Sequence, residues 1–313
     1  MTHASPYFRL TALLLTTGLI AAGCGSNDDT ADPASNPDDA SGSVAGESLD
    51  VVVGFYPLEW ATSRIAGDSD SITVETLTSP GVEPHDVELT PQAVADAQGA
   101  DLVIYSSGLQ PAVDQAVDTQ ASEHAYDVNE AADLSITTDE GVDPHFWLDP
   151  QRMADVSLAI ADRLTELDPA DAQTYQANAD ALIEELTTLD EEFTSGLASC
   201  ESIDVVTTHD AFGYLAQRYG LEMIGITGVS PEAEPSPARL AEVSAIVQET
   251  GVDTIYAEVL LGKEIARTVA DETGAQVLVL DPVEGITDAS AGSDYFEVMR
   301  ANLAALQEGQ GCS

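Results

Sequence analysis

Basic residues are almost absent from this chain of 313 residues. It has 9 lysines and arginines against 56 aspartates and glutamates, which gives a formal net charge of −47 at pH 7. A surface this acidic repels nucleic acid and anionic membrane surfaces, so we expect no nucleic-acid partner. Acidity of this kind also predicts a well-hydrated, soluble surface, but it does not bear on the fold.

The N-terminus lacks an apolar run long enough to span a bilayer. The run from Leu10 to Ala22 is too short for a membrane helix and is typical of a secretory signal, which we place at residues 1–24. It ends in Ala21-Ala22-Gly23-Cys24, which resembles a bacterial lipobox. We therefore expect an exported lipoprotein, anchored through Cys24 on the outer face of the cytoplasmic membrane or held in the periplasm. An ordinary cleaved signal peptide is the alternative.

Apolar residues are also scarce in residues 25–48, which consist mainly of Ser, Asp, Gly, Pro and Asn. Such a segment cannot offset the entropy of ordering, so we expect a flexible tether. Cysteine is rare too, with three in the whole chain. In an exported protein the remaining pair, Cys200 and Cys312, predicts a disulfide. Two buried thiols are the alternative.

What remains after the tether alternates between strand and helix patterns. The run at 49–56 is apolar and β-branched, and further strands are expected at 72–77, 101–105, 126–128, 203–208, 221–227, 253–259 and 276–280. Helices are expected between them, at about 57–67, 90–99, 109–117, 150–167, 212–219, 237–250, 263–273 and 295–306. Residues 129–143 show no periodicity.

A long helix is expected in the middle of the chain. After the break at Asp168-Pro169, apolar residues continue at helical spacing from Tyr175 to Leu197. Two series of βα units separated by such a helix predict an α/β fold with two lobes. We place an N-terminal lobe at 49–149, a connecting helical segment at 150–199 and a C-terminal lobe at 200–313.

Histidine is scarce, and its placement is informative. Of the five histidines, three lie at element boundaries: His85 after the strand at 72–77, His145 before the helix that Asp149-Pro150 opens, and His209 after the strand at 203–208. Asp281 directly follows the strand at 276–280. Ligand sites in α/β sheets lie beyond the carboxyl ends of strands. We therefore predict that these four residues meet on one metal ion in a cleft between the lobes.

The chemistry of this set suits zinc. Three imidazoles and one carboxylate make a plausible four-coordinate Zn²⁺ site. Asp86, Asp149 and Asp210 are candidates to orient the rings. Glu83 is a further possible oxygen donor, and His124, in an acidic segment, is a candidate for collecting metal.

Several stretches resemble one family. GVEPHDVELTPQAVADAQGADLVIY, DPHFWLDPQRMADVSLAIADRL, VVTTHDAFGYLAQRYGLE, SPEAEPSPARLAEV and KEIARTVADETGAQVLVLDPVEG are similar to solute-binding lipoproteins of zinc/manganese ABC transporters (metal-binding cluster A-I). The resemblance implies two α/β lobes joined by a long helix and a metal held by His85, His145, His209 and Asp281. It also implies delivery to a membrane permease driven by a separate ATPase.

The resemblance also bears on the choice of metal. Manganese members tend to have a carboxylate where this chain has His209, so Zn²⁺ is favoured over Mn²⁺. The His-rich loop of many zinc members is replaced here by a short acidic segment at 118–143.

Three alternatives to a monomeric zinc carrier stay open: a manganese or iron carrier, a surface adhesin and a zinc hydrolase. A hydrolase needs an open metal position and a general base, and no HExxH motif occurs. We therefore expect no enzyme activity.

Overall fold

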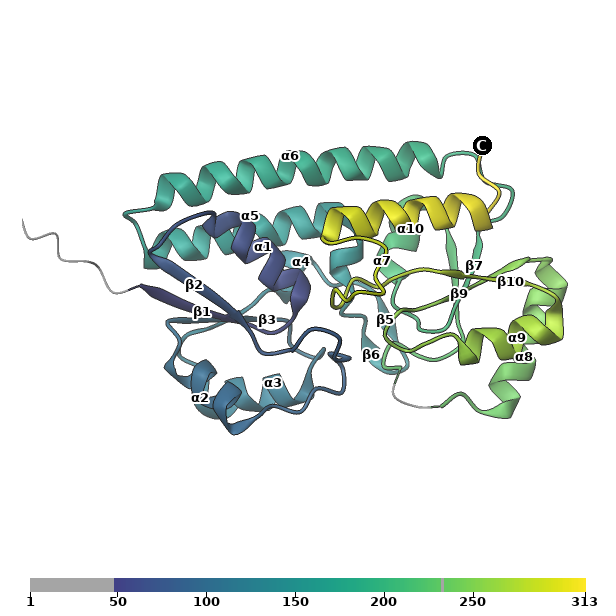
Figure 1. The fold of residues 1–313 in the computed structure, drawn as a ribbon, viewed down its shortest axis with the longest axis horizontal. Helices are drawn as coiled ribbons and strands as arrows, with labels where there is room; N and C mark the ends of the chain where they lie inside the picture. The colour runs from purple at the N-terminus through teal and green to yellow at the C-terminus, as the bar shows by residue number, and fades with distance from the viewer. Residues whose placement is uncertain (1–47, 232–233) are drawn as a thin grey trace, which may run out of the picture. The chain divides into compact units, whose positions relative to one another are not determined.

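The computed structural model describes residues 48–231 and 234–313, and shows two four-stranded parallel sheets in two lobes (Figure 1). The predicted signal peptide, Cys24 and all of the predicted tether except Ser48 lie outside the described residues. In the described part of the chain, no helix has the length and apolar character needed to cross a membrane.

The first lobe contains a sheet of strand order β2-β1-β3-β4. Its strands are β1 (Leu49–Val53), β2 (Ile72–Thr76), β3 (Leu102–Tyr105) and β4 (Ala125–Asp127), and its helices are α1 (Tyr56–Ala66), α2 (Pro91–Gly99), α3 (Pro111–Ala116) and α4 (Asn129–Ala132). A π-helical turn, Val117–Ala121, extends α3. Thr90 caps α2 by accepting a hydrogen bond from the Ala93 amide at 3.1 Å, the role that Thr-Pro predicts.

Residues 129–143 are more ordered than the sequence predicts. Besides α4 they form a small antiparallel hairpin of β5 (Thr137–Thr138) and β6 (Gly141–Val142). Each strand has two residues, which is too short for any hydrophobic period to be visible.

Two helices follow the first lobe. Asp149 caps α5 (Pro150–Leu167) by accepting from the Gln151 amide at 3.0 Å. The break predicted at Asp168-Pro169 separates it from α6 (Ala172–Gly196), which has 25 residues. Helix α6 packs beside α5 and also contacts α1 and α10 (Tyr295–Gly309), as Figure 1 shows. Its role as a rigid connector stays a prediction.

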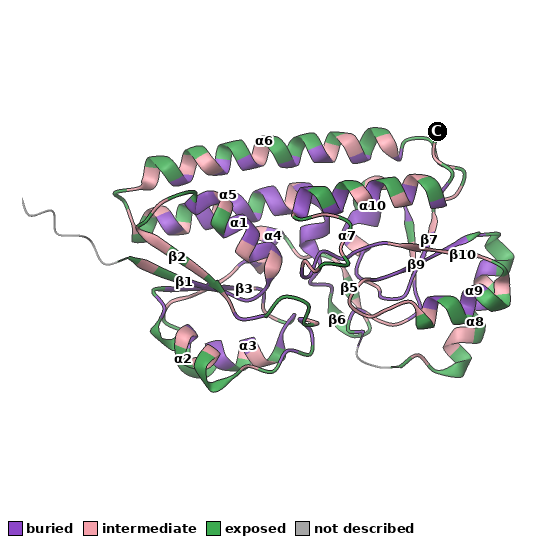
Figure 2. Cartoon of the chain, viewed as in Figure 1, coloured by how far each residue is buried: buried purple, intermediate pink, exposed green. Residues whose placement is uncertain are grey.

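Two ion pairs fasten α6 to neighbouring helices. Glu185 pairs with Arg64 of α1, and Glu192 pairs with Arg300 of α10 at 2.7 Å. The buried side of α6 consists of Tyr175, Ala179, Leu182, Leu186, Leu189 and Phe193, and its other side is exposed (Figure 2). Just beyond this helix, Cys200 forms a disulfide with Cys312.

The second lobe contains a sheet of strand order β10-β9-β7-β8. Its strands are β7 (Asp204–Thr207), β8 (Glu222–Gly225), β9 (Thr254–Ala257) and β10 (Gln276–Val279), and its helices are α7 (Gly213–Tyr219), α8 (Pro237–Thr250) and α9 (Glu264–Thr273), with α10 after them. All strand pairs in both four-stranded sheets are parallel. The carboxyl ends of the strands therefore gather at one edge of each sheet.

The largest hydrophobic core continues from one lobe into the other through α5, α6 and α10. Aromatic rings lie at its centre: Phe55 meets Trp147 at 4.7 Å between ring centroids, and Trp60 stacks on Tyr295 at 4.5 Å. A smaller core fills each lobe on its own. Through the contact between Trp60 and Tyr295, the start of α10 is tied to α1 of the first lobe.

Candidate metal centre

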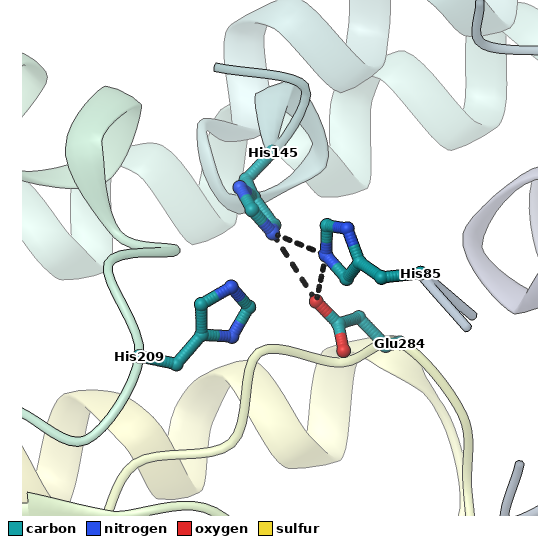
Figure 3. Close-up of side chains that lie close together, drawn as sticks. All are labelled: His85, His145, His209 and Glu284. Carbon is teal, nitrogen blue, oxygen red and sulfur yellow. Dashed lines mark hydrogen bonds and ion pairs between the residues drawn. The ribbon is translucent and has the colours of Figure 1, made fainter. Parts of the chain in front are cut away.

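Three of the four predicted ligands meet. His85, His145 and His209 form a buried group with Glu284, in which one donor atom from each residue lies within 4.8 Å of the others. His85 comes from the loop between β2 and α2, and His145 directly precedes the 3₁₀ turn Phe146–Leu148 that leads into α5. His209 follows β7, and Glu284 lies between β10 and α10 (Figure 3).

The donor atoms converge closely. The Nε2 atoms of His85 and His145 are 3.1 Å apart, and Glu284 Oε1 lies 3.3 Å from His145 Nε2 and 3.6 Å from His85 Nε2. The ring of His209 faces these groups (Figure 3), with its centroid 4.9 Å from that of His145 and 5.4 Å from that of His85. Neither carboxylate oxygen of Glu284 has a hydrogen-bond partner in the described part of the chain. A buried carboxylate left in this way is free to bind a cation.

Asp143 orients His145. Its Oδ1 atom lies 2.7 Å from His145 Nδ1 and also accepts from the His145 amide at 3.0 Å. Since Nδ1–H donates to this carboxylate, the lone pair of Nε2 is directed at the other donors. Asp143 is itself held in place, because Tyr214 donates its hydroxyl hydrogen to the Asp143 carbonyl at 2.9 Å.

His209 is engaged at both nitrogens. Its Nδ1 atom lies 3.3 Å from Glu258 Oε1, and its Nε2 atom lies 3.0 Å from the Val229 carbonyl oxygen. Both contacts suit the protonated ring, in which both nitrogens donate. Burial lowers the pKa of His209, but the charges of Glu258 and Glu284 outweigh it and raise this pKa to about 10. To bind His209, a metal ion must therefore displace a proton from the ring. It must also replace the contact of one ring nitrogen with either Glu258 or the Val229 carbonyl.

Burial and neighbouring charges also shift the pKa values of other ionisable groups at the site. Burial lowers the pKa of His85 and raises that of Glu258. For Glu284, the effect of burial is outweighed by the nearby imidazoles of His145 and His85, and the pKa of this carboxyl is lowered well below its usual range. Glu284 is therefore an anion at neutral pH, as a metal ligand must be.

Asp281 is not a member of this group, and Glu284 takes the fourth position in its place. The Asp281 carboxylate turns back on its own loop, where Oδ1 accepts a hydrogen bond of 2.8 Å from the Val283 amide. Its pKa is raised by burial to about 6. The prediction of Asp281 rested on its position directly after a strand and on the family resemblance. Glu284 stands three residues later in the same matching stretch, beyond a Pro-Val turn whose shape the sequence does not show.

The further candidates, Glu83 and His124, differ in their relation to the group. Glu83 Oε1 accepts from the His85 amide at 3.3 Å, and burial raises the pKa of this carboxyl to about 8. His124 lies away from it, with Nε2 2.9 Å from the Ala97 carbonyl oxygen. Of the carboxylates expected to orient the rings, none does so in the described structure. Asp143 and Glu258 take that role instead of Asp86, Asp149 and Asp210.

Comparison with known proteins gives consistent results. The sequence model of one family, described as zinc-uptake complex component A, periplasmic, matches residues 51–309. The zinc-binding lipoprotein AdcA of Streptococcus pneumoniae is 35% identical over 283 residues, which cover 84% of this chain. The chain spans 56% of the length of that relative.

Two more relatives match over most of their own length. The high-affinity zinc uptake system protein ZnuA of Bacillus subtilis is 33% identical over 309 residues, or 93% of each chain. Among solved structures, the laminin-binding protein of Streptococcus agalactiae, described as bifunctional with adhesin and metal-transporting activity, has a TM-score of 0.76. It is 34% identical, and the match covers 84% of this chain and all of that one.

Proposed function

Because the chain belongs to the family of periplasmic A components of zinc-uptake complexes, we propose that it captures Zn²⁺ outside the cytoplasm and delivers it to the permease of an ABC importer. The observation that carries this proposal is the convergence of three imidazoles and the Glu284 carboxylate at one buried point. Zinc is the cargo of this site. Transport of this zinc into the cytoplasm requires a permease and a separate ATPase as partners.

The donor set favours zinc over manganese. Three nitrogen donors with a single carboxylate suit Zn²⁺, whereas Mn²⁺ prefers a site richer in oxygen. His209, which stands where manganese members tend to have a carboxylate, is one of the three. We assign His85, His145, His209 and Glu284 as the ligands.

Four protein donors favour a carrier over a hydrolase. A catalytic zinc keeps one position for water, whereas a site with four protein ligands is complete without it. The protein is accordingly proposed to be a monomeric carrier without enzyme activity, exported and anchored through Cys24. Adhesion is a property of the Streptococcus agalactiae relative, and we do not extend it to this chain.

Metal analysis and titration test this function. The protein as purified is expected to contain one zinc per chain by elemental analysis, and Zn²⁺ is expected to displace Mn²⁺ in competition. His145→Ala and Glu284→Gln should each weaken zinc binding by orders of magnitude, because each removes a ligand, while circular dichroism shows an unchanged fold. His124→Ala is the matched control, since His124 lies outside the group, and should bind like the wild type. Tight stoichiometric zinc binding by both ligand variants would refute the ligand assignment.

A further inference from the structure

Val283 has a backbone conformation that valine rarely adopts. Its φ is +59°, and among the described residues other than glycine only Asp133 also has a positive φ. A β-branched side chain in the left-handed region is sterically unfavourable. The side chain of Val283 is also fully buried. Such a conformation persists only where the surroundings enforce it, and this happens most often at functional sites.

Asp281 and Asn302 hold this turn. Asp281 Oδ1 accepts a hydrogen bond of 2.8 Å from the Val283 amide. Asn302, on α10, binds both backbone groups of Asp281: its Oδ1 accepts from the Asp281 amide at 2.8 Å, and its Nδ2 donates to the Asp281 carbonyl at 2.6 Å. Pro282, which stands between Asp281 and Val283, has a fixed φ. The turn is therefore anchored to α10 and closed on itself by one carboxylate oxygen.

The conformation of Val283 decides where Glu284 points. Glu284 is the next residue, and its carboxylate reaches the two imidazoles without a hydrogen bond of its own in the described structure. With φ of Val283 in the ordinary negative range, the chain would leave Pro282 in another direction and take Glu284 with it. The placement of the proposed fourth ligand thus depends on the backbone before it.

We propose that Asp281 is a positioning residue for the metal site rather than a ligand: by accepting the Val283 amide hydrogen it holds the left-handed turn that aims Glu284 at the three histidines. The inference rests on the proposed function, because it takes Glu284 as a zinc ligand. It also gives Asn302 a part in metal binding, although the hydrogen bonds of the Asn302 side chain in the described structure go to Asp281.

The remaining oxygen of Asp281 makes a direct test necessary. Asp281 Oδ2 has no hydrogen-bond partner among the described residues, so a ligand role is the rival explanation for this buried carboxylate. The two roles differ in what they require. A ligand needs the negative charge, whereas a positioning residue needs only an acceptor for the Val283 amide, and asparagine also supplies one.

The test measures Zn²⁺ affinity by chelator competition in four variants. Asp281→Ala should weaken binding about 10- to 100-fold, the usual effect of losing support behind a ligand. Asp281→Asn should keep most of the wild-type affinity. The double variant Asp281→Ala with Val283→Gly should recover much of the loss, because glycine adopts a positive φ without the clamp. Asp133→Gly, which relieves the same kind of strain far along the chain, is the control and should bind like the wild type.

Each outcome separates the two roles. If Asp281→Asn is as weak as Asp281→Ala, or if Val283→Gly restores nothing in the Asp281→Ala background, the positioning role is refuted. Should Asp281→Ala fail to fold, as judged by circular dichroism, the asparagine and double variants still decide. Glu284→Gln tests the proposed function separately: if it binds zinc like the wild type, Glu284 is not a ligand, whatever the Asp281 series shows.

Discussion

The indole nitrogen of Trp147 donates a hydrogen bond of 2.7 Å to the carbonyl oxygen of Pro282, 135 residues away. Trp147 stands two residues after the proposed ligand His145, and Pro282 stands two residues before the proposed ligand Glu284. This bond therefore links the backbone segments that carry two ligands from different parts of the chain. Tyr295 adds a second link, because its hydroxyl donates to the Trp147 carbonyl at 2.6 Å.

Replacing Trp147 with Phe tests this link. The variant keeps an aromatic ring beside Phe55 but leaves the Pro282 carbonyl buried without its donor. We expect the free energy of unfolding to fall by about 1–3 kcal/mol, which is the cost of an unsatisfied buried polar group. Zinc affinity should also fall, because the turn before Glu284 loses one support. Denaturant unfolding and zinc titration measure the two effects.

Trp60→Phe is the control for Trp147→Phe. Trp60 is also buried against aromatic rings, but its indole makes no hydrogen bond within the described structure. It should change stability through packing alone and leave zinc affinity unaltered. An equal loss of affinity in both variants would show that packing, and not the bond to Pro282, supports the site.

The disulfide should stabilise the protein without affecting zinc binding. Cys200 and Cys312 are 112 residues apart in sequence. Cys200 lies between the end of α6 and the start of β7, and Cys312 follows α10. The disulfide is therefore at the amino end of β7, whereas the metal group lies beyond the carboxyl ends of the strands. Replacing both cysteines with serine should lower the free energy of unfolding by about 2–5 kcal/mol. Chelator competition should give the wild-type affinity. A large loss of affinity would mean that the position of α6 and α10 controls the site.

Salt should stabilise the fold. A formal charge of −47 makes the compact state repel itself. Raising the ionic strength shortens the screening length from about 10 Å at 0.1 M to about 3 Å at 1 M, which weakens this repulsion. The unfolding temperature should therefore rise between 0.1 and 1 M KCl, measured by circular dichroism. Sucrose at equal osmolarity is the control for solvent exclusion. An unfolding temperature that stays constant or falls in KCl would show that self-repulsion does not limit stability.

Local chemistry in the sequence was enough to predict much of this fold. Thr90 and Asp149 start their helices as Thr-Pro and Asp-Pro predict, and the three histidines meet because each follows or precedes an element whose pattern is visible. The position of Glu284 has no such local origin. It depends on the φ of Val283, on Asn302 and on Trp147, which are contacts made only after the chain has folded.

The residues that orient the rings were also beyond local reasoning. Sequence neighbours such as Asp86 and Asp210 were the natural candidates, because each adjoins a histidine. The structure uses Glu258 for His209, from the end of a different strand, β9. Parallel strands that are neighbours in a sheet need not be neighbours in sequence, and β7 pairs with both β8 and β9. Strand order, which periodicity does not give, decides which carboxylate reaches the ring.

Asp143 should matter for affinity through His145. Asp143→Ala removes the acceptor of the His145 Nδ1 hydrogen, so the ring loses both its fixed tautomer and its orientation. We expect zinc affinity to fall by about 10- to 100-fold. Asp143→Asn keeps an acceptor oxygen and should lose less. Asp139→Ala, on the exposed tip of the β5–β6 hairpin, is the control. Affinities measured by competition with a chromogenic chelator should follow this order; equal affinity in the wild type and Asp143→Ala would remove Asp143 from the site.

Zinc binding should depend on pH well above the ordinary range of histidine. The pKa of His209 in the metal-free protein is raised to about 10 by Glu258 and Glu284 against the effect of burial. Below that pH the ring holds a proton that competes with the metal, so apparent affinity must rise as pH rises. One displaced proton corresponds to about a tenfold gain per pH unit. An unshifted histidine, with a pKa near 6.5, would instead give a plateau above about pH 7.5.

Chelator competition from pH 6 to 9, corrected for the protonation of the chelator, measures this slope. Calorimetry in buffers of different ionisation enthalpy counts the released protons. Glu258→Gln provides the decisive comparison. It removes the charge that contributes most to raising the pKa of His209, and it keeps a polar side chain of the same size. Its plateau should begin at lower pH than that of the wild type. A wild-type affinity that is constant between pH 7 and 9 would show that His209 is already neutral there, and that Glu258 orients the ring without holding a proton on it.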